Sequence, residues 1–560
     1  MILIVASLLT LFLAVPPQPA DLAAAFPEGR LAALRVPSGQ ELFDSAPLQL
    51  ALTRLREHGA LVELDAGRAA LRLATGADPA DWLAFLLGGE VQLGVYAPKP
   101  SKLADEGGGR RRLLAVARTR DAEGCQRILD AVLGVIESDK GNDVRRSRYR
   151  EVTCTRINHE LVVARLAELL LVASDDDLLA AALDRLLDGS PPAAAAPAGA
   201  GLLAFSVDPE LLRPRDWKPL AGEARRALGK RIANPLGNLL FGGLLLGEGP
   251  IDGSLGADGS TLELRAALPP APDDAPAAWF PPGAASFAVP ATPQTLGVLA
   301  LRRDLSDWWR ERELLMSEDS QSQLAKTDET LSLLFMGGSP AEDVFAALGP
   351  ELALVVDRQT FADAPEPDVK LPGACLVAHM RDSQAFGPAV QVAFQTLVGF
   401  LNTDRAQKRQ SPFLIDSVVH EGTTLRAARL LPRDGEEPGT DSNASPAVAV
   451  VDDWLLVGTS LEQVRGLVGA LHAGALRTVG GGPLSLQVDG AGLLALARDD
   501  RDVLVAQHIL EEGLSAEEAG RKVDNLLALL GDVRSLDLSV TRAADGLDVL
   551  LRLALGDGAP

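Results

Sequence analysis

The feature that most constrains the fold of this chain is a long internal repeat. Residues 87–93 read Leu-Gly-Gly-Glu-Val-Gln-Leu and residues 348–354 read Leu-Gly-Pro-Glu-Leu-Ala-Leu, so 261 positions separate Leu87 from Leu348. Two further pairs of motifs repeat at the same spacing: Asp78-Pro79 with Ser339-Pro340, and Arg120-Asp121 with Arg381-Asp382. One spacing held across three motifs predicts that the chain contains two copies of one module.

The two copies also open alike, with Phe26-Pro27-Glu28-Gly29 and Val36-Pro37 in the first and Phe280-Pro281-Pro282-Gly283 and Val289-Pro290 in the second. A chain of 560 residues is too long for one hydrophobic core, so more than one domain is expected from size alone. The segment 270–279 is rich in Pro and Ala, as in a stiff and exposed linker. We therefore predict a first module at 26–269, a linker at 270–279 and a second module at 280–556.

Local signals predict the same first elements in both copies. Asp78-Pro79 and Ser339-Pro340 are typical helix starts, because an N-cap side chain is followed by a proline that fits the first turn. These helices should end at Gly88 and Gly349, since glycine is the usual residue at a helix C-terminus. Strands are expected to follow directly, at Glu90–Tyr96 and Glu351–Asp357.

Long helices and hairpins complete each copy. Asp121 and Asp382 are the expected N-caps of the long helices. Further strands are expected around Glu151-Val152-Thr153 and Glu421-Gly422-Thr423, and hairpins around the Asp-Gly turns at 258–259 and 545–546. Hairpins that alternate with helices predict an α+β fold. Each of the two homologous tandem modules should form an antiparallel or mixed sheet with helices packed mainly on one face.

The charge of the chain bears on its partners. The formal net charge is -23 and the isoelectric point is near 4.8. A surface this acidic repels phosphate backbones and anionic lipid, so we expect no nucleic-acid partner. Membrane contact is expected only through an N-terminal segment that is not cleaved.

The N-terminus reads as an export signal at residues 1–20. Ile2 to Val15 is an uncharged apolar run, shorter than the ~20 residues that a membrane-spanning helix needs. Small residues follow it at 23–25, as in a cleaved signal peptide, although no Lys or Arg precedes the run. The protein is therefore expected in the periplasm or outside the cell, with an uncleaved tether as the alternative.

The residues that often carry chemistry form no recognisable site. Cys125, Cys154 and Cys375 are expected to be small apolar core residues, and a disulfide between the first two stays open. None of the six histidines has a second His or a Cys at metal-ligand spacing, so no metal or cofactor is predicted. A catalytic His with distant Ser and Asp partners stays open as well.

Four patterns could suggest a site but have simpler structural explanations. Ser339 in Gly-Gly-Ser-Pro-Ala lacks the final Gly of a nucleophile elbow and should cap a helix. Asp175-Asp176-Asp177 should favour a helix N-terminus. Arg110-Arg111-Arg112 should end a solvated loop. Trp308-Trp309 should be one core residue beside one partly exposed residue.

The module opening, the Leu-Gly-x-Glu turn, the Arg-Asp helix start and the N-terminal signal resemble those of a group of duplicated exported bacterial proteins of unassigned function. The resemblance extends over nearly the whole mature chain. It implies no activity and no catalytic residues.

We therefore predict an exported, non-enzymatic envelope protein with a binding or scaffolding role. Its partner would be an envelope protein, a glycan or a lipid. Two alternatives stay open: a hydrolase with a site between the two modules, and a carrier of an apolar ligand.

Overall fold

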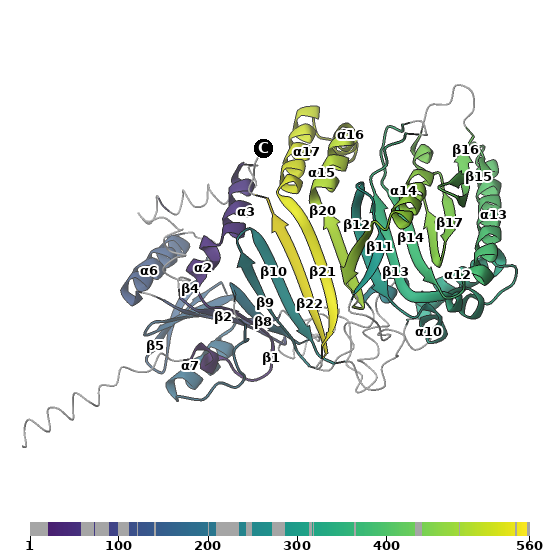
Figure 1. Ribbon diagram of the computed structural model, residues 1–560. Coiled ribbons are helices and arrows are strands. Elements are labelled where there is room, and N and C mark those ends of the chain that lie inside the picture. Colours follow the sequence, from purple (N-terminus) through teal and green to yellow (C-terminus); the bar gives the residue numbers. More distant parts are fainter. Residues whose placement is uncertain are drawn as a thin grey trace, which may run out of the picture. The chain divides into compact units, whose positions relative to one another are not determined.

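The computed structural model forms two compact units. Unit 1 comprises residues 1–217 and 250–257, and unit 2 comprises 218–249 and 258–560 (Figure 1). The structure describes residues 21–57, 72, 89–98, 111–119, 121–138, 142–158, 160–199, 201–208, 235–241, 249–270, 286–312, 316, 318–362, 366–431, 439–480, 482–543 and 546–556. The expected signal at 1–20, the helix start at Asp78 and most of the linker lie outside these residues.

Unit 1 is built on an antiparallel sheet in the order β9-β8-β1-β2-β3-β7-β6-β5-β4. Its strands are β1 (Arg30–Val36), β2 (Val91–Tyr96), β3 (Arg112–Arg118), β4 (Val144–Tyr149), β5 (Val152–Ile157), β6 (Leu161–Leu166), β7 (Leu169–Ala173), β8 (Leu203–Val207) and β9 (Ile251–Asp258). Its helices are η1 (Leu22–Ala25), α2 (Gly39–Asp44), α3 (Ala46–Glu57), α6 (Ala122–Ser138) and α7 (Asp176–Leu187).

The sheet of unit 1 has helices on both faces. Helix α7 buries Leu179 and Leu183 in the same cluster as Val162 of β6. Helix α6 lies on the other face, where Cys125 packs with Val163 and Leu170. Val163 follows Val162 in β6, and successive residues of a strand point to opposite faces of the sheet. The predicted packing on mainly one face is therefore wrong. Strand β7 is apolar along its whole length, which is the pattern of a strand covered on both sides.

Unit 2 contains the larger antiparallel sheet, in the order β10-β22-β21-β20-β12-β13-β14-β18-β17-β16-β15. Its strands are β10 (Thr261–Leu268), β12 (Thr295–Arg302), β13 (Leu348–Asp357), β14 (Gly373–Met380), β15 (Phe413–His420), β16 (Thr423–Leu430), β17 (Ala447–Val451), β18 (Trp454–Gly458), β20 (Leu484–Asp489), β21 (Val533–Ala543) and β22 (Gly546–Leu555). Strands β11 (Ser286–Pro290) and β19 (Leu476–Gly480) form a separate two-stranded sheet.

The helices of unit 2 are α9 (Pro235–Phe241), α10 (Leu305–Arg310), α12 (Glu318–Leu334), η5 (Pro340–Val344), η6 (Phe345–Ala347), α13 (Ser383–Gln407), η7 (Thr440–Asn443), α14 (Leu461–His472), α15 (Gly490–Asp499), α16 (Arg501–Glu512) and α17 (Ala516–Gly531). Within the described ranges, no helix combines the length and apolar character that a membrane crossing requires.

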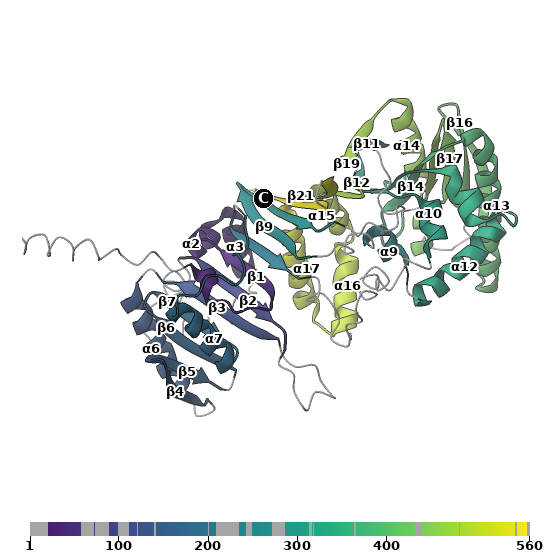
Figure 2. The same cartoon turned by 90° about the horizontal axis from the view of Figure 1, so that it is seen from below.

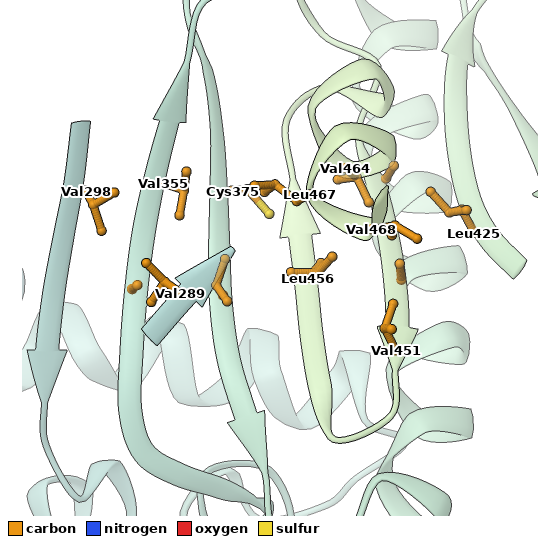
Figure 3. Close-up of a cluster of buried hydrophobic side chains, with 14 of the residues drawn as sticks. Val289, Val298, Val355, Cys375, Leu425, Val451, Leu456, Val464, Leu467 and Val468 are labelled. Carbon is orange, nitrogen blue, oxygen red and sulfur yellow. The ribbon is translucent and has the colours of Figure 1, made fainter. Parts of the chain in front are cut away.

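The main core of unit 2 lies between the sheet and α14. Val355, Cys375 and Leu456 of three strands meet Val464 and Leu467 of α14 there (Figure 3). Burying one such aliphatic side chain contributes roughly 1.5–3 kcal/mol to folding. The sheet positions between these residues face α13, which lies on the opposite side from α14 (Figure 2).

The α13 helix comes close to the sheet at a glycine. A Cβ atom at Gly387 would lie 3.7 Å from the side chain of Val450, which lies between two core residues of β17, Ala449 and Val451. Unit 2 therefore also has helices on both faces of its sheet.

Several local predictions are confirmed. The strand expected at Glu90–Tyr96 matches β2 within one residue at both ends. The strand expected at Glu351–Asp357 lies within β13, which ends at the same residue but begins at Leu348. The carboxylate of Asp382 accepts a hydrogen bond from the N–H of Ala385 and caps α13. Asp175 caps α7 in the same way through the N–H of Leu178. These signals act over a few residues, which is why the sequence alone reveals them.

Other local predictions differ from the structure. Glu151 and Glu421 are turn residues with positive φ angles of 66° and 49°, and the strands begin after these turns. Ser339 does not cap an α-helix: its N–H donates to the carboxylate of Asp343, and a π-helical turn follows. Trp308 and Trp309 are both buried, whereas the sequence predicts one partly exposed residue. The reason is that the 3₁₀ turn containing Phe345 covers Trp309, with the ring centroids 5.1 Å apart.

The three cysteines are free and buried. The open question of a bridge between Cys125 and Cys154 is therefore settled against it. Their side chains lie on opposite faces of the sheet, in separate hydrophobic clusters.

Candidate functional site

A concave feature that also carries charge lies in unit 1, between the β4–β5 hairpin and helix α7. Its volume is about 520 Å³. We call it the β4–α7 groove. It is lined by Arg145, Arg146, Ser147, Arg148, Tyr149, Cys154, Arg156, Val162, Asp176, Asp177, Leu179, Ala180 and Leu183.

The floor of the groove is apolar and is formed by side chains of the buried core. Cys154, Val162, Leu179 and Leu183 are each at most 5 % exposed. They belong to the cluster that joins α7 to the sheet. Strand β4 lies beyond this cluster and, among the described residues, pairs with β5 alone. The groove therefore exists because the sheet extends one strand further than its covering helix.

One end of the groove is closed by polar contacts between the hairpin and the last turn of α7. The hydroxyl of Tyr149 donates to Asp184 Oδ2 at 2.8 Å, and Arg150 pairs with Asp184 at 3.0 Å and with Asp188 at 2.6 Å. The hydrogen bond to Asp184 raises the pKa of Tyr149 above its ordinary value. The phenol therefore stays protonated and donates at neutral pH.

The other end of the groove carries two arginines. Arg145 of β4 lies directly opposite Arg156 of β5 in the strand register. Like charges in this arrangement repel, and two carboxylates offset the repulsion. Arg145 pairs with Asp143 at 2.8 Å, and Arg156 pairs with Asp176 at the start of α7.

This mouth is open to solvent. The side chain of Arg145 is 67 % exposed. From Val152, beside the closed end, to Arg156 the strand advances about 13 Å at ~3.3 Å per residue. The groove therefore combines an apolar floor of that length with two guanidinium groups at one end.

The chemistry of the groove favours binding over catalysis. Guanidinium groups recognise carboxylates and phosphates through paired hydrogen bonds. The thiol of Cys154 is no nucleophile, because burial raises its pKa and keeps it protonated. Across the described part of the chain, no three His, Cys, Asp or Glu side chains are grouped so that they could hold a metal ion.

One histidine has the partners of a catalytic base. His472 Nε2 lies 3.3 Å from the hydroxyl of Thr423, and its Nδ1 lies 3.3 Å from the carboxylate of Glu421. Both distances are longer than a normal hydrogen bond. Glu421 is in the β15–β16 turn and His472 ends α14, so the contact joins a hairpin to a helix end. In unit 1, the contact of Arg150 with Asp184 likewise joins a hairpin to a helix end.

The other histidines have structural surroundings or fall outside the description. His379 packs edge-on against Trp454, and His508 contacts Glu512 one helical turn away. His58 and His159 lie outside the described residues.

A buried polar cluster in unit 2 was not anticipated from the sequence. Asp357, at the end of β13, is 3 % exposed and accepts a hydrogen bond from the hydroxyl of Thr292 at 3.1 Å. Gln463 of α14 donates to the carbonyl of Val355 at 2.9 Å. Asp357 Oδ1 and Gln463 Oε1 are both buried and both lack a donor.

Burial raises the pKa of Asp357, and this favours the neutral acid. A proton on Oδ1 supplies the donor that these buried oxygens lack. In unit 1, strand β2 ends with Tyr96. The hydroxyl of Tyr96 donates to the carbonyl of Pro27 at 3.3 Å. Asp357 follows Tyr96 by 261 positions in the sequence, but this spacing gave no sign of burial.

No family model matches this chain, and no curated protein matches it. Crystal structures of TP0453 are among the solved structures with some similarity. Crystal form III is 12 % identical, with 46 % of this chain and 83 % of that chain covered and a TM-score of 0.24. Crystal form I is 9 % identical, with 44 % and 78 % covered and a TM-score of 0.22. TM-scores this low carry no argument about the fold or the function.

Proposed function

We propose that this protein is a non-enzymatic binding protein whose unit 1 holds a small anionic ligand with an apolar part in the β4–α7 groove. The observation that carries this proposal is the placement of Arg145 and Arg156 opposite each other at the end of an apolar floor. The two guanidinium groups would bind a phosphate or carboxylate. The floor between Cys154 and Leu183 would receive the apolar part.

The ion pair between Arg145 and Asp143 at the mouth does not prevent such binding. The pair of Arg145 and Asp143 is largely exposed, and exposed pairs are worth only about 0–1 kcal/mol. A bidentate contact from an anion to guanidinium is stronger than that. A ligand anion can therefore replace Asp143 at little cost.

The size of the groove limits the ligand. Small-molecule sites have volumes of roughly 300–1,000 Å³, and the groove lies within this range. Its length suits a short chain rather than a polymer. The protein would thus act as a carrier or sensor of an acidic amphiphile.

The test is calorimetric titration with octyl phosphate, with octanol and inorganic phosphate as the two halves of that ligand. Octyl phosphate should bind at least about tenfold more tightly than either half, which is about 1.4 kcal/mol. Equal binding of octanol would show that the arginines do not anchor the ligand. No binding of octyl phosphate would refute the proposal.

A matched pair of variants locates the site. The double substitution Arg145→Gln and Arg156→Gln should abolish the preference for octyl phosphate over octanol. The control is Arg127→Gln, because the Arg127 side chain is 80 % exposed on α6, on the other face of the sheet, and does not line the groove. That variant should bind like the native protein.

We further propose that the two units are copies of one module and that the protein is exported. The matching order of strands supports the first point, since β1, β2, β3, β7, β6, β5 and β4 follow one another as β12, β13, β14, β18, β17, β16 and β15 do. The apolar run at 2–15 supports the second. Mass analysis of the protein from envelope and culture fractions tests export: a chain found only in the cytosol with residues 1–20 intact would contradict it.

A further inference from the structure

The β4–α7 groove is bounded at both ends by contacts between the hairpin and the helix. At the mouth, Arg156 of β5 pairs with Asp176, the first residue of α7. At the closed end, the hydroxyl of Tyr149 of β4 donates to Asp184 Oδ2 at 2.8 Å. Asp184 follows Asp176 by eight residues. That is about 12 Å of helix at ~1.5 Å per residue.

The strand register gives the same length. Beyond the arginine pair of the mouth, Ser147 lies opposite Cys154, and Tyr149 lies opposite Val152. Side chains two residues apart on a strand point to the same face, so these three pairs follow one another along the groove. From the arginine pair to the Tyr149 pair, β4 advances about 13 Å at ~3.3 Å per residue. Helix and strand therefore agree on where the groove ends.

The middle of the groove is hollow because its side chains are small. Ser147 of β4, Cys154 of β5 and Ala180 of α7 all line the groove. On the helix, Ala180 lies halfway between the two acids that bound the groove. A larger side chain at any of these three positions would fill part of the space. The next pair along the strands ends the hollow, because it contains the Tyr149 ring.

Tyr149 crosses the end of the groove. Its backbone belongs to β4, its ring packs against the core cluster of unit 1, and its hydroxyl contacts α7. The next residue, Arg150, pairs with Asp184 at 3.0 Å and with Asp188 at 2.6 Å. These contacts join the hairpin to the helix at the same point. A ligand chain cannot extend past this point without displacing the ring.

We propose that Tyr149 sets the chain length of the ligand, and that the groove accepts a chain of at most about eight carbons beyond the anionic group. This inference rests on the proposed binding of an acidic amphiphile in the same groove. Carbon atoms in contact stay about 3.5–4.0 Å apart, so about 9 Å of the ~13 Å is open to the chain. An extended chain advances about 1.25 Å per carbon, given bonds of ~1.5 Å at ~111°. The open length therefore holds about seven or eight carbons.

The test is calorimetric titration of the native protein with butyl, hexyl, octyl, decyl and dodecyl phosphate, each below the concentration at which it forms micelles. From butyl to octyl phosphate, each added methylene should tighten binding by up to about fourfold, the usual effect of burying a methylene. Decyl and dodecyl phosphate should bind no more tightly than octyl phosphate. Affinity that rises through dodecyl phosphate would overturn this inference and leave the proposed binding intact. If no member of the series binds, the proposed function is refuted, and this inference with it.

Truncation of the ring tests Tyr149 itself. In Tyr149→Ala the groove is open at both ends, so decyl phosphate should bind about tenfold more tightly than octyl phosphate. The control Leu187→Ala truncates a largely exposed side chain in the last turn of α7 that does not line the groove. It should keep the native order of affinities. A Tyr149→Ala variant that is folded and still prefers octyl phosphate would overturn the inference.

A second variant shortens the groove and does not disturb the core. Ser147 is exposed on the outer strand, so Ser147→Leu leaves the buried residues in place. The new side chain would fill the groove about 7 Å from the arginine pair, at ~3.3 Å per residue. Octyl phosphate should then bind no more tightly than butyl phosphate. If Ser147→Leu binds octyl phosphate as the native protein does, the chain does not lie between the arginines and Tyr149, and the inference is wrong.

Discussion

Units 1 and 2 each fasten a hairpin to the end of a helix, with opposite charges. In unit 1 the base, Arg150, is on the hairpin and the acids, Asp184 and Asp188, are on α7. In unit 2 the acid, Glu421, is on the hairpin and His472 is on α14. The two contacts are therefore alike in arrangement and opposite in the placement of their charges. Polar positions that differ in this way are where the two units can differ in function.

The hydrophobic packing beneath these contacts should tolerate substitution less well than the contacts themselves. Leu183 of α7 is fully buried in the core of unit 1. Leu183→Ala should destabilise unit 1 by about 2–5 kcal/mol, the usual cost of such a cavity. Hydrogen exchange should show the loss of protection in unit 1 alone if the two cores are independent.

The control for this prediction is Leu187→Ala in the last turn of the same helix, where the side chain is largely exposed. It should change stability by less than about 1 kcal/mol. Equal loss of protection in both units after Leu183→Ala would break the comparison, because it would show that they unfold together.

The second prediction concerns Asp357, the buried acid at the end of β13 in unit 2. Burial raises the pKa of Asp357 in the folded protein above its ordinary value of 3.8, although the hydrogen bonds from Thr295 and Thr292 and the charge of Arg477 oppose this shift. As pH rises above that value, the unfolded chain loses its proton before the folded chain does. The native protein should therefore lose stability as pH rises, until Asp357 ionises in the folded state.

Asp357→Asn should remove this pH dependence, because an amide can donate to Gln463 without ionising. The stability of the variant relative to the native protein should therefore be greater at pH 7 than at pH 4. Urea unfolding at the two pH values measures the effect. The control Asp502→Asn changes an acid whose side chain is 98 % exposed, and it should leave the pH dependence unchanged. An Asn variant that follows the native pH dependence would show that Asp357 is ionised in the fold.

Sequence reasoning was successful where the signal is local. Asp382 and Asp175 were expected at helix starts because the residues they cap are three positions away. The strand at Glu351–Asp357 was expected because its apolar run follows a turn. Helices on both faces were missed, since which side of a strand is covered depends on helices far away in the chain.

The candidate site depends on such distant relations throughout. Arg145 and Arg156 form one mouth only because the β4–β5 register places them opposite each other. The floor requires α7 to pack over β5 and β6. Nothing in the sequence around the arginines of β4 distinguishes residues that line a groove from residues on a solvated edge. Asp357 likewise resembles any acid at the end of a strand.

The last prediction compares the two hairpin contacts directly and has the smallest expected effect. Tyr149→Phe removes a hydrogen bond from a phenol to the carboxylate of Asp184. A net hydrogen bond is worth about 0.5–1.5 kcal/mol, so unit 1 should lose about 1 kcal/mol. Glu421→Gln removes only an exposed contact of 3.3 Å to His472 and should cost less than about 0.5 kcal/mol. Urea midpoints and hydrogen exchange in the two hairpins measure both. If Glu421→Gln proved the more damaging change, His472 and Thr423 would hold more than a hairpin in place, and the arrangement of hydroxyl, imidazole and carboxylate would be the feature of unit 2 to pursue.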